Sequence, residues 1–176
     1  MHHIPNIISF FRILLVGVFW ALFRQQRYVA ALAVYVFAFF SDVMDGRLAR
    51  RYNWISNLGK LLDPLADKLL TVAALTCIFS AKQRPVYLVI LVLVAFKELL
   101  MIAGGIFLMR RSVIVYADWV GKLAAGFFAV GTVLTLVSFF SGGVEPWNIY
   151  ILIAATALSY AALVHYGLRQ FGGRRV

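Results

Sequence analysis

The chain has 176 residues, of which 63% are hydrophobic and 14% are charged, and its formal net charge is +10. A soluble domain of this size could not hide so much apolar surface, because its surface-to-volume ratio demands polar cover. The composition therefore excludes an ordinary soluble protein and predicts one integral membrane domain over residues 1–176. The positive charge indicates contact with anionic membrane lipids rather than with nucleic acid.

Six apolar stretches are long enough, or nearly so, to cross a hydrocarbon core as a helix, which takes about 20 residues. In chain order they are 6–23, 28–44, 61–79, 85–109, 119–140 and 147–166. Strands are not expected, since no segment alternates apolar and polar residues over the length of a barrel strand. The sequence therefore predicts a polytopic all-α protein with six transmembrane helices.

The first stretch follows Ile4-Pro5-Asn6 and contains Arg12 early in its run. Two interpretations of Arg12 stay open: it extends to the headgroups at the membrane interface, or it lies near a lipid phosphate. This stretch lacks a small-residue cleavage site, so we expect no removable signal peptide. The single cysteine, Cys77, lies in an apolar run and is expected to pack as a small hydrophobe.

Basic residues are divided unequally between the two sides of a six-span arrangement. One side holds ten of them: Arg47, Arg50, Arg51, Lys60, Arg110, Arg111, Lys122, Arg169, Arg174 and Arg175. The other side holds four: Arg24, Arg27, Lys82 and Arg84. Because positive residues gather on the cytoplasmic side, we expect both termini in the cytoplasm. The chain is compact and shows no transit segment, so we expect a bacterial inner membrane.

Four of the seven acidic residues lie where the second stretch ends and the third begins: Asp42, Asp45, Asp63 and Asp67. Their separations of three and four residues place each pair on one face of a helix. Four crowded carboxylates repel one another unless they are protonated or bridged by cations. Hard oxygen ligands of this kind select Mg²⁺, Mn²⁺ or Ca²⁺, so the sequence predicts a metal site within the membrane.

The residues between the two pairs suit a ligand that carries phosphate. Gly46, Ala49 and Gly59 leave the backbone open to close approach, and Arg50 supplies a forked cation. Together with a metal, these residues indicate a pyrophosphate substrate and metal-assisted phosphoryl transfer. The alternative is a buried salt-bridge network with nearby lysines and arginines, which brings little net stability after desolvation.

This segment resembles the signature of the CDP-alcohol phosphatidyltransferase family. Eight fixed positions match over 26 residues: Asp42, Asp45, Gly46, Ala49, Arg50, Gly59, Asp63 and Asp67. The resemblance implies a six-helix membrane fold, usually a homodimer, whose active site opens to the cytoplasmic leaflet. It implies transfer of a phosphatidyl group from CDP-diacylglycerol to an alcohol.

The resemblance also implies a role for each matching residue. Asp42, Asp45 and Asp63 would hold one or two Mg²⁺ or Mn²⁺ ions. Asp67 would contact the metal and act as general base on the acceptor hydroxyl. The site for the CDP-linked lipid would be formed by Asp42, Gly46, Ala49, Arg50 and Gly59.

The run Leu62–Lys68 most resembles the phosphatidylglycerophosphate synthases of this family, whose acceptor is glycerol 3-phosphate. The same run occurs in CMP-forming cardiolipin synthases, whose acceptor is phosphatidylglycerol. The candidate ligands for the acceptor are Lys97, Arg110, Arg111 and Lys122. Lys97 and Glu98 lie inside the fourth stretch, where charge is expected to be functional or paired, and we expect Glu98 to pair with a neighbouring base.

An ion-coupled membrane transporter is the alternative of another class, since acids within a membrane also bind and move ions. A transporter more often shows repeats or broken helices in both halves, whereas this chain gathers its acids in one segment. A scaffold protein has no need of four crowded charges. The pattern therefore favours an enzyme.

Overall fold

The computed structural model of the chain contains six α-helices and, within the residues that it describes, no strand. It describes residues 4–51, 59–109 and 119–171, and the side chains of 11–41, 68–104 and 119–167 apart from Val120 and Tyr166. The helices are α1 (Ile4–Arg24), α2 (Tyr28–Arg51), α3 (Gly59–Lys82), α4 (Pro85–Met109), α5 (Trp119–Val137) and α6 (Trp147–Phe171). The prediction of six helices and no strand is confirmed for the described residues.

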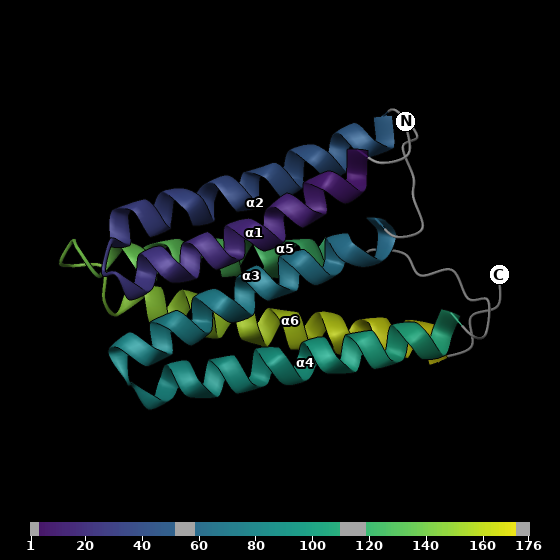
Figure 1. The fold of residues 1–176 in the computed structure, drawn as a ribbon. Coiled ribbons are helices and arrows are strands. Elements are labelled where there is room, and N and C mark those ends of the chain that lie inside the picture. Colours follow the sequence, from purple (N-terminus) through teal and green to yellow (C-terminus); the bar gives the residue numbers. More distant parts are fainter. Residues whose placement is uncertain (1–3, 52–58, 110–118, 172–176) are drawn as a thin grey trace.

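The six helices lie side by side in one bundle (Figure 1). The links from α1 to α2, from α3 to α4 and from α5 to α6 lie at one end, which we call the linker end. Helix α1 begins and α6 ends at the opposite end, which we call the aspartate end because α2 finishes and α3 begins there. The links from α1 to α2 and from α3 to α4 turn tightly at Gln26 and Gln83, which have left-handed φ angles of 59° and 51°.

Several helix boundaries differ from those predicted; α3 and α6, for example, continue to Lys82 and Phe171. Helix α2 continues to Arg51 instead of ending near Met44, and α3 begins at Gly59 instead of Leu61. Helix α5 ends at Val137, three residues before the predicted Phe140. The prediction followed the apolar runs, whereas a helix continues through polar residues until a turn stops it. Both aspartate pairs consequently lie within helices.

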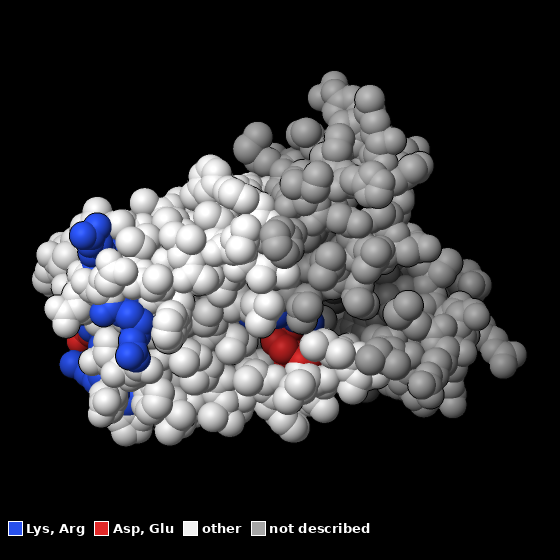
Figure 2. Space-filling model, in the orientation of Figure 1, with Lys and Arg blue, Asp and Glu red and all other residues white. Residues whose placement is uncertain are grey.

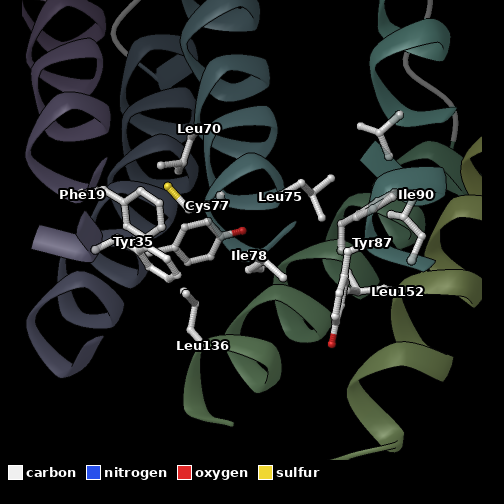
Figure 3. Close-up of a cluster of buried hydrophobic side chains, with 14 of the residues drawn as sticks. Phe19, Tyr35, Leu70, Leu75, Cys77, Ile78, Tyr87, Ile90, Leu136 and Leu152 are labelled. Atoms are coloured by element: carbon white, nitrogen blue, oxygen red, sulfur yellow. The ribbon is translucent and has the colours of Figure 1, made fainter. Parts of the chain in front are cut away.

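Aromatic and aliphatic side chains fill the space between α1, α2 and α3. The rings of Phe19 on α1 and Tyr35 on α2 have centroids 5.9 Å apart. Figure 3 shows them beside Leu70 and Cys77 of α3. Cys77 is buried, which confirms the expectation that it packs as a hydrophobe.

The other half of the bundle is joined by polar contacts as well as by close packing. The buried Asn148 of α6 donates from Nδ2 to the Tyr87 hydroxyl of α4 (3.1 Å) and to Thr135 Oγ1 of α5 (3.3 Å). Gly131 of α5 lies so near α6 that a Cβ atom there would be 2.9 Å from the Leu152 side chain. These contacts fix α4, α5 and α6 relative to one another.

Large apolar side chains cover much of the outside of the bundle. On α4, for example, Val89, Val92, Phe96 and Leu99 are each more than half exposed. By length and composition, Pro85–Gly104 and Trp147–His165 are apolar enough to cross a membrane. Tyr28–Ser41 and Gly121–Val137 are shorter apolar helices. This surface agrees with a membrane protein, since soluble proteins rarely expose such large apolar patches.

Candidate active site

One stripe of α2 faces the interior of the bundle. Its described members are Ala31, Tyr35 and Ala38, which are at most 3% exposed. Separations of four and three residues keep positions on one face of a helix. The same separations continue through three predicted site residues: Asp42, Asp45 and Ala49. Their side chains lie outside the described ones, and the unbroken register of α2 aligns these positions with the inward stripe.

The same relation holds in α3. The buried residues Leu70, Ala74 and Cys77 form its inward stripe. Counting back from Leu70 by three and then by four residues gives Asp67 and Asp63. Their side chains are also outside the described ones, but their helix positions continue the buried stripe.

The two aspartate pairs therefore lie on two helices at one end of the bundle. Helix α1 packs against both α2 and α3. Figure 1 shows the last turns of α2 and the first turns of α3 at the aspartate end. The described side chains include no group of three or more His, Cys, Asp or Glu residues, and the aspartates are not among them. Four aspartates at helix positions that continue the buried stripes are a residue set that suits a hard divalent cation.

Arg12 lies on the face of α1 that is turned to these helices. Its side chain is only 2% exposed and is the largest fully buried side chain in the part of the chain described. The interpretation that Arg12 extends to the headgroups at the interface is therefore wrong. Sequence reasoning missed its burial, although Arg12 stands seven residues before the buried Phe19 on the same helix face.

Several charged positions lie at one height in the bundle. A helix rises about 1.5 Å per residue, so the distance of each position from the linker end follows from the helix boundaries. Arg12 is about 18 Å from that end, Glu98 about 20 Å, and Asp42, Asp67 and Lys68 about 21–23 Å. Charge on four consecutive helices is thus concentrated in one layer below the aspartate end.

Lys68, Lys97 and Glu98 form an ionic group between α3 and α4. Glu98 Oε2 lies 2.6 Å from Lys68 Nζ, and Glu98 Oε1 lies 2.5 Å from Lys97 Nζ. Figure 2 shows a group of acidic and basic side chains partway along the bundle, at the edge of the part not described. The expectation that Glu98 pairs with a neighbouring base is confirmed. Sequence reasoning had not included Lys68 among the candidate site residues.

The remaining predicted residues are placed as follows. Lys122 is exposed near the start of α5, where its ammonium group lies 5.7 Å from the centre of the Trp119 ring. Gly46 and Arg50 lie in α2, and Gly59 is the first residue of α3, with their side chains outside the described ones. The candidates Arg110 and Arg111 lie outside the described residues.

The linker end carries a separate polar cluster. Glu145, in the link before α6, pairs with Lys82 and, at 3.0 Å, with Arg84. The hydrogen bond from Lys82 holds the pKa of the Glu145 carboxyl below its usual value. A cavity of about 330 Å³ opens beside this cluster, and Figure 2 shows the basic side chains gathered there. It lies at the end of the bundle opposite to the aspartates, so it is not part of the candidate site.

Comparison with known proteins identifies relatives across most of the chain. The family model for CDP-alcohol phosphatidyltransferase matches residues 2–164. A CDP-diacylglycerol–glycerol-3-phosphate 3-phosphatidyltransferase of Aquifex aeolicus is 33% identical over 111 residues, which cover 62% of each chain. A probable phosphatidylglycerophosphate synthase of Mycobacterium tuberculosis is 32% identical over 182 residues, covering 98% of this chain and 85% of the relative. A CMP-forming cardiolipin synthase of Streptomyces coelicolor is 40% identical over 109 residues, covering 58% of this chain and 50% of the relative.

The match to the family model identifies an enzyme that transfers a phosphate-linked group rather than an ion transporter or a scaffold. The chain belongs to the CDP-alcohol phosphatidyltransferase family. The resemblance found in the segment from Asp42 to Asp67 is thereby confirmed over residues 2–164.

Proposed function

We propose that this protein transfers the phosphatidyl group of CDP-diacylglycerol to glycerol 3-phosphate and releases CMP. The product is phosphatidylglycerophosphate, a lipid of phospholipid biosynthesis. The observation that carries the proposal is the register of α2 and α3, in which Asp42, Asp45, Asp63 and Asp67 continue buried stripes at one end of the bundle. Two relatives with this activity in their names support the choice of acceptor.

The aspartates would hold one or two divalent ions, Mg²⁺ or Mn²⁺. The ligands would be Asp42, Asp45 and Asp63, with Asp67 in contact with the same site. When bound, such an ion neutralises the diphosphate of the donor and stabilises the charge that develops on leaving CMP. Four carboxylates without Cys or His suit these hard ions better than zinc.

The residues of this chain would act on the substrates as follows. Gly46, Ala49 and Gly59 leave room for the cytidine diphosphate, and Arg50 pairs with its phosphates. Asp67 takes the proton from the acceptor hydroxyl while the acceptor oxygen attacks the phosphorus that bears diacylglycerol. The bond from this phosphorus to the CMP oxygen breaks, and CMP leaves with the electron pair.

The acceptor phosphate is assigned to basic side chains at the same end. Lys97 is the candidate inside the bundle, whereas Lys122 is exposed at the start of α5. Arg110 and Arg111 remain candidates from the sequence. All four would attract an anionic acceptor from the aqueous side.

We place all six helices across the membrane. Helices of 19 to 25 residues are about 28–38 Å long, which is close to or above the thickness of a hydrocarbon core of about 30 Å. The aspartate end faces the cytoplasm of a bacterial inner membrane, since the loops predicted there carry more basic residues than the linker end. The protein acts as a homodimer, as the family resemblance implies.

Phosphatidylglycerol is the second candidate acceptor, which would make the enzyme a CMP-forming cardiolipin synthase. The observation in its favour is the Streptomyces coelicolor relative, 40% identical over 109 residues. The two reactions share the donor, the metal and the base, and they differ in whether the acceptor is a soluble phosphate ester or a lipid.

The test is an assay of the purified full-length protein in lipid nanodiscs with CDP-diacylglycerol and Mg²⁺ or Mn²⁺. We expect CMP release with glycerol 3-phosphate, and mass spectrometry should identify phosphatidylglycerophosphate. Asp67→Asn should abolish turnover while cytidine nucleotide binding partly survives. If the enzyme forms cardiolipin from CDP-diacylglycerol and phosphatidylglycerol but does not use glycerol 3-phosphate, the proposed acceptor is replaced. If CMP is released with neither acceptor, the proposed reaction is rejected.

A further inference from the structure

Glu98 joins two helices inside the apolar part of the bundle. It lies in Pro85–Gly104, the part of α4 that is apolar enough to cross a membrane, and its side chain is 17% exposed. One carboxylate oxygen contacts Lys68 of α3 at 2.6 Å, and the other contacts Lys97 of α4 at 2.5 Å. A single carboxylate therefore holds two ammonium groups from different helices next to each other.

This group has an excess of positive charge, because it contains two ammonium groups and one carboxylate. The side chains of Lys68 and Lys97 are only 21% and 13% exposed. Charge is expensive at this depth and is usually functional there. Without Glu98 the two ammonium groups would repel each other, and their flexible stems would let them turn toward the headgroups. Glu98 keeps them together, and the excess charge attracts an anion.

The ionic group of Lys68, Lys97 and Glu98 lies at about the height of the proposed catalytic base in the bundle. Lys68 follows Asp67 directly on α3, and Asp67 is the proposed base for the acceptor hydroxyl. In glycerol 3-phosphate only three carbon atoms separate the reacting hydroxyl from the phosphate. A cationic site for that phosphate must therefore lie near the base, and the helix boundaries place Lys68, Lys97 and Asp67 at a similar height in the bundle.

We propose that Glu98 is a positioning residue that holds Lys68 and Lys97 together as the binding site for the phosphate of a phosphomonoester acceptor. The proposal rests on the proposed function and extends it, because it adds Lys68 to the acceptor site and gives Glu98 a role. It also bears on specificity. A phosphomonoester carries up to two negative charges at neutral pH, whereas the phosphodiester of phosphatidylglycerol carries one, so two fixed ammonium groups favour glycerol 3-phosphate.

The test compares Glu98→Gln with a matched control in the full-length protein in nanodiscs. Glu145→Gln is the control, because Glu145 also holds two cations, Lys82 and Arg84, but does so at the linker end. For Glu98→Gln we expect the KM for glycerol 3-phosphate to rise about tenfold or more, since ordered charge-assisted contacts are lost. The KM for CDP-diacylglycerol should stay within about twofold of the wild-type value. Glu145→Gln should leave both constants unchanged.

Two further variants keep the test decisive if Glu98→Gln folds poorly. Lys68→Gln removes one of the cations and should raise the same KM, while Glu98→Asp keeps the charge and should restore part of the affinity. Binding of glycerol 3-phosphate to the metal-free protein, followed by ³¹P NMR, should weaken in Glu98→Gln and Lys68→Gln.

The outcomes separate this proposal from the proposed function. A wild-type enzyme that does not use glycerol 3-phosphate overturns the function and this inference with it. If the wild type uses glycerol 3-phosphate but folded Glu98→Gln and Lys68→Gln keep its KM, only the inference is overturned. The same holds if both substrates lose affinity equally or if Glu145→Gln has the same effect.

Discussion

Replacing Arg12 by methionine removes a charge that the bundle buries at the height of the aspartates. A guanidinium in a side chain that is 2% exposed needs an anion nearby, because desolvating an unbalanced cation costs several kcal/mol. Of the seven acidic residues, Glu98 and Glu145 each hold two other cations. The acids that remain are the four aspartates and Asp118. We therefore expect Arg12 to balance part of the aspartate charge.

The size of the effect follows from the packing of α1 against α2 and α3. Neighbouring helix axes are about 8–10 Å apart, and we take this spacing as the scale of the separation between the guanidinium of Arg12 and an ion held by the aspartates. At an effective dielectric constant of about 20, a divalent ion and a guanidinium repel each other by about 3–4 kcal/mol over that distance. Without a metal ion, Arg12→Met leaves the aspartate charge unbalanced, so in chelator this variant should be about 3 kcal/mol less stable than the wild type. It should bind Mg²⁺ or Mn²⁺ at least about tenfold more tightly, after allowance for screening.

The assay is thermal unfolding of the purified protein in detergent, first with EDTA and then over a series of Mn²⁺ concentrations. Arg12→Lys is the matched control, because it keeps the charge and should show a metal dependence like that of the wild type. A deficit of Arg12→Met that is equal with and without Mn²⁺ would refute the reasoning, as would weaker Mn²⁺ binding by this variant.

Two further predictions concern the packing of α5 and the linker end. Gly131→Val should destabilise the protein by about 1–3 kcal/mol through overpacking against Leu152, and Leu152→Ala should recover part of this loss in a double-mutant cycle of unfolding midpoints. The folded-state pKa of Glu145 is lowered by Lys82, so its contribution to stability is present at neutral pH and is lost as the pH falls through that pKa. The difference in midpoint between wild type and Glu145→Gln should therefore shrink on acidification; a difference that stays constant with pH would show that this ion pair does not contribute.

Much of the arrangement could be predicted from the sequence because it depends on local periodicity. The apolar runs gave six helices, and the spacing of Asp42, Asp45, Asp63 and Asp67 gave two pairs on helix faces. The structure adds that these spacings continue stripes that are buried further along α2 and α3. The same periodicity could have been followed from Ala31 to Ala49 in the sequence alone.

The contacts between helices could not be predicted in this way. The pairing of Lys68 with Glu98 depends on α3 lying beside α4, and no local pattern specifies which helices are neighbours. The burial of Arg12 likewise depends on α2 and α3 covering one face of α1. From the sequence, an arginine early in an apolar run is equally compatible with the membrane interface.

The most direct measurement is the affinity of the metal-binding site for Mn²⁺ in the wild type and in Asp45→Asn, Asp63→Asn and their double mutant. These aspartates lie on different helices, so a shared ion requires both. We expect the wild type to bind one or two ions per chain and each single variant to lose affinity strongly. The double mutant should lose little more Mn²⁺ affinity than either single variant, because each single variant already disrupts binding of the shared ion. Unchanged Mn²⁺ affinity in the folded single variants would contradict a metal centre built from α2 and α3.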